Sequence, residues 1–275
     1  MVPMFKLQYG SNFFMEAPHI AQITKLSLRG CGEVVSACFA SEIFSRLPNL
    51  IHVDLTGCYK ITDHTIHQLI TDHCRGALKL KTLILHRCFA LTSKTLNTIV
   101  HHCFKLECLD IGGGCGALVD RRALDVLSHQ GTASQRLLSG FKVFKMDGSH
   151  YLTTHAIIGF FRCWGSFDSG LNLQSLDISD TYCVTDEVLD CIFPVNHNSQ
   201  SIGMPKQLRI KMTSCDQVLK RSAMQLKQRL EVMHERKVFV KENCRLYDGS
   251  DDDIRRFINT VTGTEPLIFF VSSEV

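Results

Sequence analysis

Cysteine and histidine, the side chains best suited to metal binding and nucleophilic chemistry, each occur 13 times among the 275 residues. Zinc sites usually place such ligands in close pairs, as in Cys-x2–4-Cys. The closest cysteines, Cys103 and Cys108, form a single pair at the upper limit of this spacing. The adjacent His101 and His102 would point in different directions on a helix. The spacing therefore predicts no metal site, no catalytic Cys/His pair and no cofactor.

A glycine-rich run, Gly112 to Gly116, is the other feature that could bind a small molecule. A phosphate-binding loop requires a following Gly-Lys-Ser/Thr, and a dinucleotide fingerprint requires Gly-x-Gly-x-x-Gly at the start of a helix. Neither pattern is present. We interpret the run as a distorted turn in which Gly112 leaves the surface bare, so that a partner's backbone could approach.

A repeating pattern sets the positions of many cysteines. The pattern is apolar-x-apolar-x-x-Cys, and it predicts a short strand followed by a tight turn. Its successive starts are 26 to 35 residues apart. The seven matches, three of them with Gly, Ser or Thr at the last position, are Leu26-Leu28-Cys31, Val53-Leu55-Cys58, Leu83-Leu85-Cys88, Leu109-Ile111-Gly114, Phe144-Met146-Ser149, Leu176-Ile178-Thr181 and Ile210-Met212-Cys215.

A helix is predicted after most of these turns. Apolar residues recur there with helical spacing, as at Ile66, Leu69 and Ile70. A residue that can accept from the free amides of a first helical turn precedes each helix. These expected caps are Thr62, Thr92, Asp120, Thr153 and Thr185. Each unit thus predicts a strand, a turn and a helix, which must stack on its neighbours to bury its apolar face.

The run from Val53 to Cys74 resembles the cysteine-containing leucine-rich repeat, a subtype typical of F-box/leucine-rich-repeat proteins and of the related yeast antagonist of mitotic exit. The resemblance covers roughly residues 23–225. It implies an α/β leucine-rich-repeat solenoid, a horseshoe with about seven parallel strands on the concave face and helices on the convex face. We expect an N-terminal cap or partial repeat at 1–22, the repeats at 23–237 and a capping segment at 238–275. In the capping segment we expect a short strand at Val238–Val240, a helix after Ser250 and a strand at Leu267–Val271.

In this family, an F-box upstream of the repeats binds a Skp-type adaptor of a cullin ligase. The first 22 residues show no F-box pattern. The resemblance therefore implies the Skp-type adaptor and cullin as partners only if an upstream F-box exists.

The concave face is the predicted partner site, because side chains alternate along a strand and the residues between core positions point outward. Aspartates lie in the middle of this face and favour a protein segment carrying Lys or Arg. The predicted partner-binding residues are Asp54, Thr56, Ile84, His86, Asp110, Lys145, Asp147, Asp177, Ser179 and Lys211.

The repeat and the resemblance favour a non-catalytic protein-protein interaction module, and composition identifies no other partner. The net charge of +3 and a pI near 8.2 indicate neither direct nucleic-acid binding nor an anionic membrane partner. We expect the protein to be cytoplasmic, with the nucleus as an alternative location, and we do not expect it to be secreted. By resemblance, the function is substrate recognition in an SCF-type ubiquitin ligase pathway. The alternative is a related scaffold or competitive regulator without direct ligase assembly.

Overall fold

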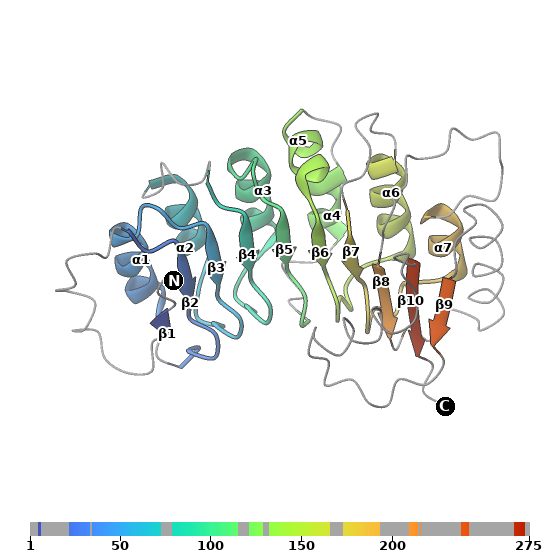
Figure 1. Ribbon diagram of the computed structural model, residues 1–275, viewed down its shortest axis with the longest axis horizontal. Helices are drawn as coiled ribbons and strands as arrows, with labels where there is room; N and C mark the ends of the chain where they lie inside the picture. Colours follow the sequence, from blue (N-terminus) through green and yellow to red (C-terminus); the bar gives the residue numbers. More distant parts are fainter. Residues whose placement is uncertain are drawn as a thin grey trace, which may run out of the picture.

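Among the described residues, ten short strands form one continuous sheet in this computed structural model (Figure 1). The strands are parallel and follow chain order from β1 to β8, after which β10 lies between β8 and β9. The structure describes residues 5–6, 22–33, 35–72, 79–114, 121–128, 132–165, 173–192, 209–213, 215, 238–241 and 267–272. The strands are β1 (Phe5–Lys6), β2 (Lys25–Ser27), β3 (His52–Asp54), β4 (Thr82–Ile84), β5 (Cys108–Asp110), β6 (Val143–Lys145), β7 (Ser175–Asp177), β8 (Arg209–Thr213), β9 (Val238–Lys241) and β10 (Leu267–Ser272).

The seven strands predicted from the repeat are confirmed as β2 to β8. Each begins one residue before the first apolar position of its pattern. In the first six, that apolar residue is buried; these residues are Leu26, Val53, Leu83, Leu109, Phe144 and Leu176. Equivalent residues of successive units lie directly beside one another, as in the register Val53 to Leu83 to Leu109. The repeat in the sequence is therefore a spatial repeat of the sheet.

A tight turn follows each of the strands β2 to β7, and it depends on one left-handed residue. The φ angle of this residue lies between 51° and 76° in six units, at Gly30, Gly57, Arg87, Gly113, Gly148 and Asp180. Glycine adopts this conformation without steric cost, which explains its use in four of the six. Gly114 is also left-handed, with φ 78°. The described part of the glycine-rich run thus confirms the predicted distorted turn, while Cys115 and Gly116 lie outside the described residues.

Helices run along one side of the sheet (Figure 1). Their buried residues recur with the predicted spacing, for example Leu96, Ile99 and Val100, which are at most 2% exposed. The helices are α1 (Ala37–Arg46), α2 (Asp63–His67) with a following π-helical turn η3 (Gln68–Asp72), α3 (Ser93–His102), α4 (Arg121–Ser128), α5 (Thr132–Gly140), α6 (Thr154–Gly165) and α7 (Asp186–Ile192). The fold is α/β, with parallel strands in one open sheet.

The predicted helix caps are confirmed at two positions and wrong at two. The Thr92 hydroxyl accepts from the amide of Lys94 at 3.3 Å, and the Thr153 hydroxyl accepts from the amide of Ala156 at 3.2 Å. Thr62 makes no such bond, because its hydroxyl pairs with another hydroxyl in the same turn. The Thr185 hydroxyl is buried without a hydrogen-bond partner among the described residues. Asp120 lies outside the described residues.

Cysteines at the turn position connect neighbouring units. Their thiols donate to a carbonyl oxygen just beyond the strand of the preceding unit, and small apolar thiols suit such tightly packed turns. These bonds are Cys58 to Leu28 at 3.2 Å, Cys88 to Leu55 at 3.1 Å and Cys215 to Ile178 at 3.3 Å.

Both ends of the sheet contain strands that do not belong to the seven predicted repeat units. The strands predicted at Val238–Val240 and Leu267–Val271 are confirmed as β9 and β10, and β10 pairs in parallel with β8. At the other end, β1 continues the register of β2, which the sequence did not predict. The helix expected after Ser250 lies outside the described residues. None of the described helices has the length and apolar character needed to cross a bilayer.

Candidate functional site

The predicted binding residues lie in two aligned rows on the sheet surface that points away from the helices, called the open face below. The strand-end row contains one outward residue from each of the strands β3 to β8. The sheet register aligns these residues, which are Asp54, Ile84, Asp110, Lys145, Asp177 and Lys211. The turn row lies two residues further along each unit. Backbone hydrogen bonds between units align its members Thr56, His86, Gly112, Asp147 and Ser179.

Exposure differs strongly within these rows. Lys211 is exposed, whereas Asp110 and Asp177 are only 7% and 9% exposed. Ser179 is 1% exposed, so its side chain offers almost no surface to a partner. The remaining predicted residues are half-buried.

Three aspartates of the strand-end row also hold the turns that follow them. In each, Oδ1 accepts from the amide two residues later, as Asp54 does from Thr56 at 2.9 Å. Asp110 accepts likewise from Gly112 at 3.1 Å, and Asp177 makes the equivalent bond. This is the local hydrogen bond that makes aspartate favourable in turns. This role of the aspartates was not predicted from the sequence, although the recurrence of aspartate at one repeat position was a signal for it.

Two lysines of the same row lie near these aspartates. Lys145 Nζ is 3.8 Å from Asp110 Oδ2, and Lys211 Nζ is 3.3 Å from Asp177 Oδ2. Both lysine side chains are more than 40% exposed. Pairs of this kind contribute little stability because water screens them. A cation from a partner can therefore replace either lysine at small cost.

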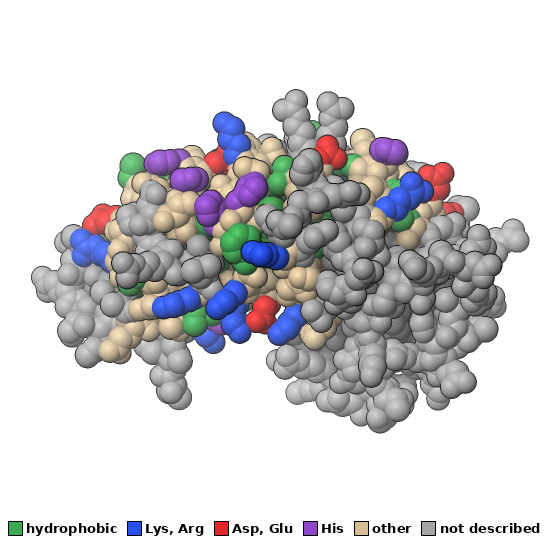
Figure 2. Space-filling model, turned by 90° about the horizontal axis from the view of Figure 1, so that it is seen from above, with side chains coloured by type: hydrophobic (Ala, Val, Ile, Leu, Met, Phe, Trp, Pro, Cys, Tyr) green, Lys and Arg blue, Asp and Glu red, His purple; other side chains and the backbone are tan. Residues whose placement is uncertain are grey.

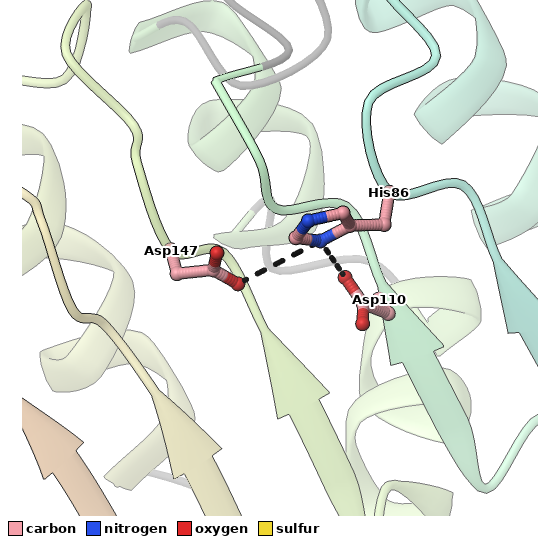
Figure 3. Close-up of side chains that lie close together, drawn as sticks. All are labelled: His86, Asp110 and Asp147. Carbon is pink, nitrogen blue, oxygen red and sulfur yellow. Dashed lines mark hydrogen bonds and ion pairs between the residues drawn. The ribbon is translucent and has the colours of Figure 1, made fainter. Parts of the chain in front are cut away.

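His86, Asp110 and Asp147 form a cluster at the centre of the open face (Figure 3). They come from the turn after β4, the end of β5 and the turn after β6. His86 Nδ1 is 3.3 Å from Asp110 Oδ1 and 4.0 Å from Asp147 Oδ1. One potential ligand atom from each residue lies within 4.8 Å of the other two. The sequence analysis placed all three on the predicted face but did not predict that they converge.

The cluster has an excess of negative charge. The hydrogen bond to Asp110 raises the pKa of His86, while burial acts in the opposite direction. Burial raises the pKa of Asp147, and the negative charges of Asp177 and Asp110 raise it further. Like charges in a partly buried site disfavour ionisation in this way. The arrangement therefore favours binding of an additional cation.

The glycine-rich turn creates the space for this cluster. A Cβ atom on Gly112 would clash with the carboxylate of Asp147, and one on Gly113 would lie 2.7 Å from His86 Nε2. The expectation that Gly112 leaves a bare surface for a partner's backbone is therefore wrong. A side chain from the next unit fills that space.

Exposed aromatic side chains lie beside the open face, in the turns between strands and helices. Phe89, Tyr151 and Tyr182 are 55%, 68% and 58% exposed, and we call them the aromatic edge. The rings of His150 and Tyr182 are 5.0 Å apart between centroids. Because parallel strands end at the same edge of a sheet, these rings follow the turn row. The signal in the sequence was an aromatic residue one or two positions after the cysteine position, as in Cys88-Phe89.

The helix side differs in composition from the open face. Figure 2 views the molecule from above the view of Figure 1 and shows histidine side chains gathered over part of that surface. Exposed histidines on the described helices are His64, His67, His101, His102 and His155. The described residues give no group of three potential metal ligands here.

The buried thiols are poor nucleophiles. Burial raises the pKa of Cys58 and Cys215 to about 12. It also raises the pKa of Cys108, at the start of β5, to about 11. Only the thiolate attacks electrophiles or binds metals strongly. These positions therefore favour packing over reactivity.

Comparisons with known proteins leave the family open. No protein-family model matches the chain. None of the curated proteins matches it either. One similar solved structure is described as the crystal structure of the Rad7 and Elc1 complex in yeast, with a TM-score of 0.30 and 13% sequence identity. That match covers 76% of this chain and 67% of the other, and similarity at this level assigns no function.

Proposed function

We propose that this chain is a leucine-rich-repeat solenoid of horseshoe shape and a non-catalytic protein-recognition module. Strand-turn-helix units in register support the architecture, because such stacks create an extended surface on their strand side. The open face would be the partner site.

The partner we propose is a protein segment carrying Lys or Arg. The observation that carries this proposal is the convergence of Asp110 and Asp147 on His86, with Asp177 close enough to raise the pKa of Asp147. A guanidinium or ammonium group placed there gains charge-assisted hydrogen bonds to the carboxylates. It would displace the weakly held Lys145.

The aromatic edge would supply the apolar part of the contact. Protein interfaces are enriched in aromatic residues, and a few large side chains contribute most of the binding energy. Tyr151 and Tyr182 are positioned at the border of the open face, where they could cover the aliphatic part of a bound Lys or Arg. This combination favours a basic segment over a purely apolar one.

The biological context we propose is substrate recognition for an SCF-type ubiquitin ligase, in the cytoplasm or nucleus. Ubiquitin transfer would then belong to other subunits. The alternative is a scaffold or competitive regulator that does not assemble with a ligase. Recovery of a Skp-type adaptor and a cullin with the chain would support the first, and recovery of neither would favour the second.

Affinity capture from cell extract, followed by mass spectrometry, tests the recognition site. The variant Asp54→Asn/Asp110→Asn/Asp177→Asn keeps the Oδ1 acceptors of the turns but removes three negative charges from the open face. We expect it to lose the partners that the wild type captures in a salt-dependent manner.

A matched control removes the same charge from the helix side, with Glu42→Gln, Asp125→Asn and Glu187→Gln, all at exposed positions. This control should retain those partners. Equal capture by the wild type and the open-face variant would contradict the proposed site.

A further inference from the structure

The centre of the open face also has the donor set of a metal site. Each of His86, Asp110 and Asp147 contributes one potential ligand atom, and these atoms lie within 4.8 Å of one another. They belong to three successive units, so the stacking of the sheet positions them. The spacing of cysteines and histidines along the sequence gave no sign of this site, because its ligands come from three different units.

The two carboxylates approach the same ring nitrogen. His86 Nδ1 lies 3.3 Å from Asp110 Oδ1 and 4.0 Å from Asp147 Oδ1 (Figure 3). A single N–H group can donate well to only one of these oxygens. A metal ion bound to the lone pair of Nδ1 would contact both carboxylates at once.

The two separations from His86 Nδ1 suit an ion of moderate size after a small closure. Zinc–nitrogen and zinc–oxygen bonds of about 2.0–2.2 Å place neighbouring tetrahedral ligands roughly 3.4 Å apart. The Nδ1 to Asp110 separation already has this value, and the Nδ1 to Asp147 separation exceeds it by well under 1 Å. Side-chain torsions can supply that movement, because Gly112 and Gly113 carry no side chains in the space around Asp147 and His86.

The site is accessible and keeps room for water. The side chains of His86, Asp110 and Asp147 are 25%, 9% and 21% exposed. Three protein ligands leave one position of a tetrahedral ion for solvent. An imidazole ligand favours zinc-like transition metals, whereas magnesium and calcium prefer oxygen ligands only.

We infer that His86, Asp110 and Asp147 form a binding site for one divalent transition-metal ion of the zinc type. The ion would use the same carboxylates as the proposed partner site, so it would compete with a partner's Lys or Arg for them. Titration of the chain without a partner tests the metal site separately from partner recognition.

Titration of the metal-free, full-length chain with Co²⁺ tests the site, because the absorption spectrum of bound cobalt distinguishes nitrogen and oxygen ligands from thiolates. A calorimetric titration with Zn²⁺ gives the affinity and stoichiometry. We expect one ion per chain, without thiolate charge-transfer bands. His86→Ala and Asp147→Asn should each weaken binding at least about tenfold, since loss of even an outer-shell partner costs 10- to 100-fold.

Asp180→Asn is the matched control, because Asp180 is exposed, belongs to the adjacent turn and contributes no ligand. It should bind the ion as the wild type does. Asp147→Asn preserves side-chain size, so the circular dichroism spectrum of this metal-free variant should match that of the wild type. It therefore keeps the test decisive if His86→Ala does not fold.

Three results would overturn the inference. One is absence of Co²⁺ and Zn²⁺ binding by the wild type. Another is binding that persists unchanged in both cluster variants or shows thiolate bands, which would place the ion on cysteines. The third is displacement of Co²⁺ by equimolar Mg²⁺, which would indicate an oxygen-only site.

Discussion

Asp63 is expected to be one of the strongest polar links between two units. It lies at the start of α2 but accepts three hydrogen bonds from the next unit. The amide of Thr92 donates to its Oδ1 at 2.8 Å, the Thr92 hydroxyl to Oδ2 at 2.7 Å and the Thr95 hydroxyl to Oδ1 at 2.6 Å. Asp63→Ala removes all three acceptors at once.

The expected loss of stability depends on whether each donor group can form another hydrogen bond once the Asp63 carboxylate is removed. Thr95 is 1% exposed, so its hydroxyl would stay buried without this acceptor, at a cost of about 1–3 kcal/mol. The amide of Thr92 loses an acceptor at the start of α3, where such a loss costs about 1 kcal/mol. The Thr92 hydroxyl is half-buried and can reach water. Together these changes should lower the free energy of unfolding by about 2–4 kcal/mol.

Urea unfolding followed by circular dichroism measures this loss, and two variants control it. Asp63→Asn retains Oδ1 and hence two of the three bonds, so it should cost less than about 1 kcal/mol. His64→Ala changes an exposed neighbour and should stay within about 0.5 kcal/mol of the wild type.

A double-mutant cycle with Thr95→Val isolates the contact between units. The combined variant should lose at least about 1 kcal/mol less than the sum of the two single losses, because both remove the same hydrogen bond. Additive losses, or an Asp63→Ala variant as stable as His64→Ala, would refute this role of Asp63.

The remaining predictions concern a charged contact and the thiols. Glu107 accepts from Lys81 at 2.9 Å and Lys142 at 2.7 Å, which lowers its pKa from 4.5 to about 2. Its folded pKa is below its unfolded one, so Glu107 stabilises the fold above pH 4.5 and loses this effect as the pH falls towards 2. Glu107→Gln should therefore lower the free energy of unfolding by only about 0.5–1 kcal/mol near pH 7, because solvent screens these exposed lysines. The difference in stability from the wild type should vanish in acid. A pH-independent difference in urea unfolding would contradict this prediction. Cys58 is fully buried, with a pKa raised to about 12, whereas Cys38 is exposed, so iodoacetamide at pH 8 should label Cys38 in the folded chain and Cys58 only after unfolding. Peptide mass spectrometry reads this out, and equal labelling of both thiols before unfolding would show the prediction to be wrong.

The positions of the strands could be predicted because one pattern carries two independent signals. Alternating apolar residues mark the strand, and the cysteine or glycine that follows marks the turn. Leu83, Leu85 and Cys88 are all fully buried, as this pattern requires. The spacing of one unit also fixes which residues of the next lie beside it, so the sequence predicted that Asp54 and Ile84 would be neighbours on the open face.

The chemistry at the centre of that face could not be predicted in the same way. It depends on how far side chains reach between units. Gly112 was expected to leave a gap, but the carboxylate of Asp147 extends from the next unit and fills it. Likewise, Lys145 and Asp110 were predicted as separate contacts for a partner, but they lie 3.8 Å apart and partly neutralise each other. Repeat spacing gives the face of the sheet on which a residue lies and not how far its side chain reaches towards the neighbouring units.

Footprinting of carboxylates on the chain, alone and bound to a captured partner, tests the central proposal most directly. Labelling with a carbodiimide and an amine, read by mass spectrometry, reports the accessibility of each acid. If the open face recognises a basic segment, Asp54 and Asp147 should become protected while Asp125 and Glu187, exposed on the helices, label as before. Protection of Asp125 and Glu187 with unchanged labelling of Asp54 and Asp147 would place the partner on the helix side and contradict the account.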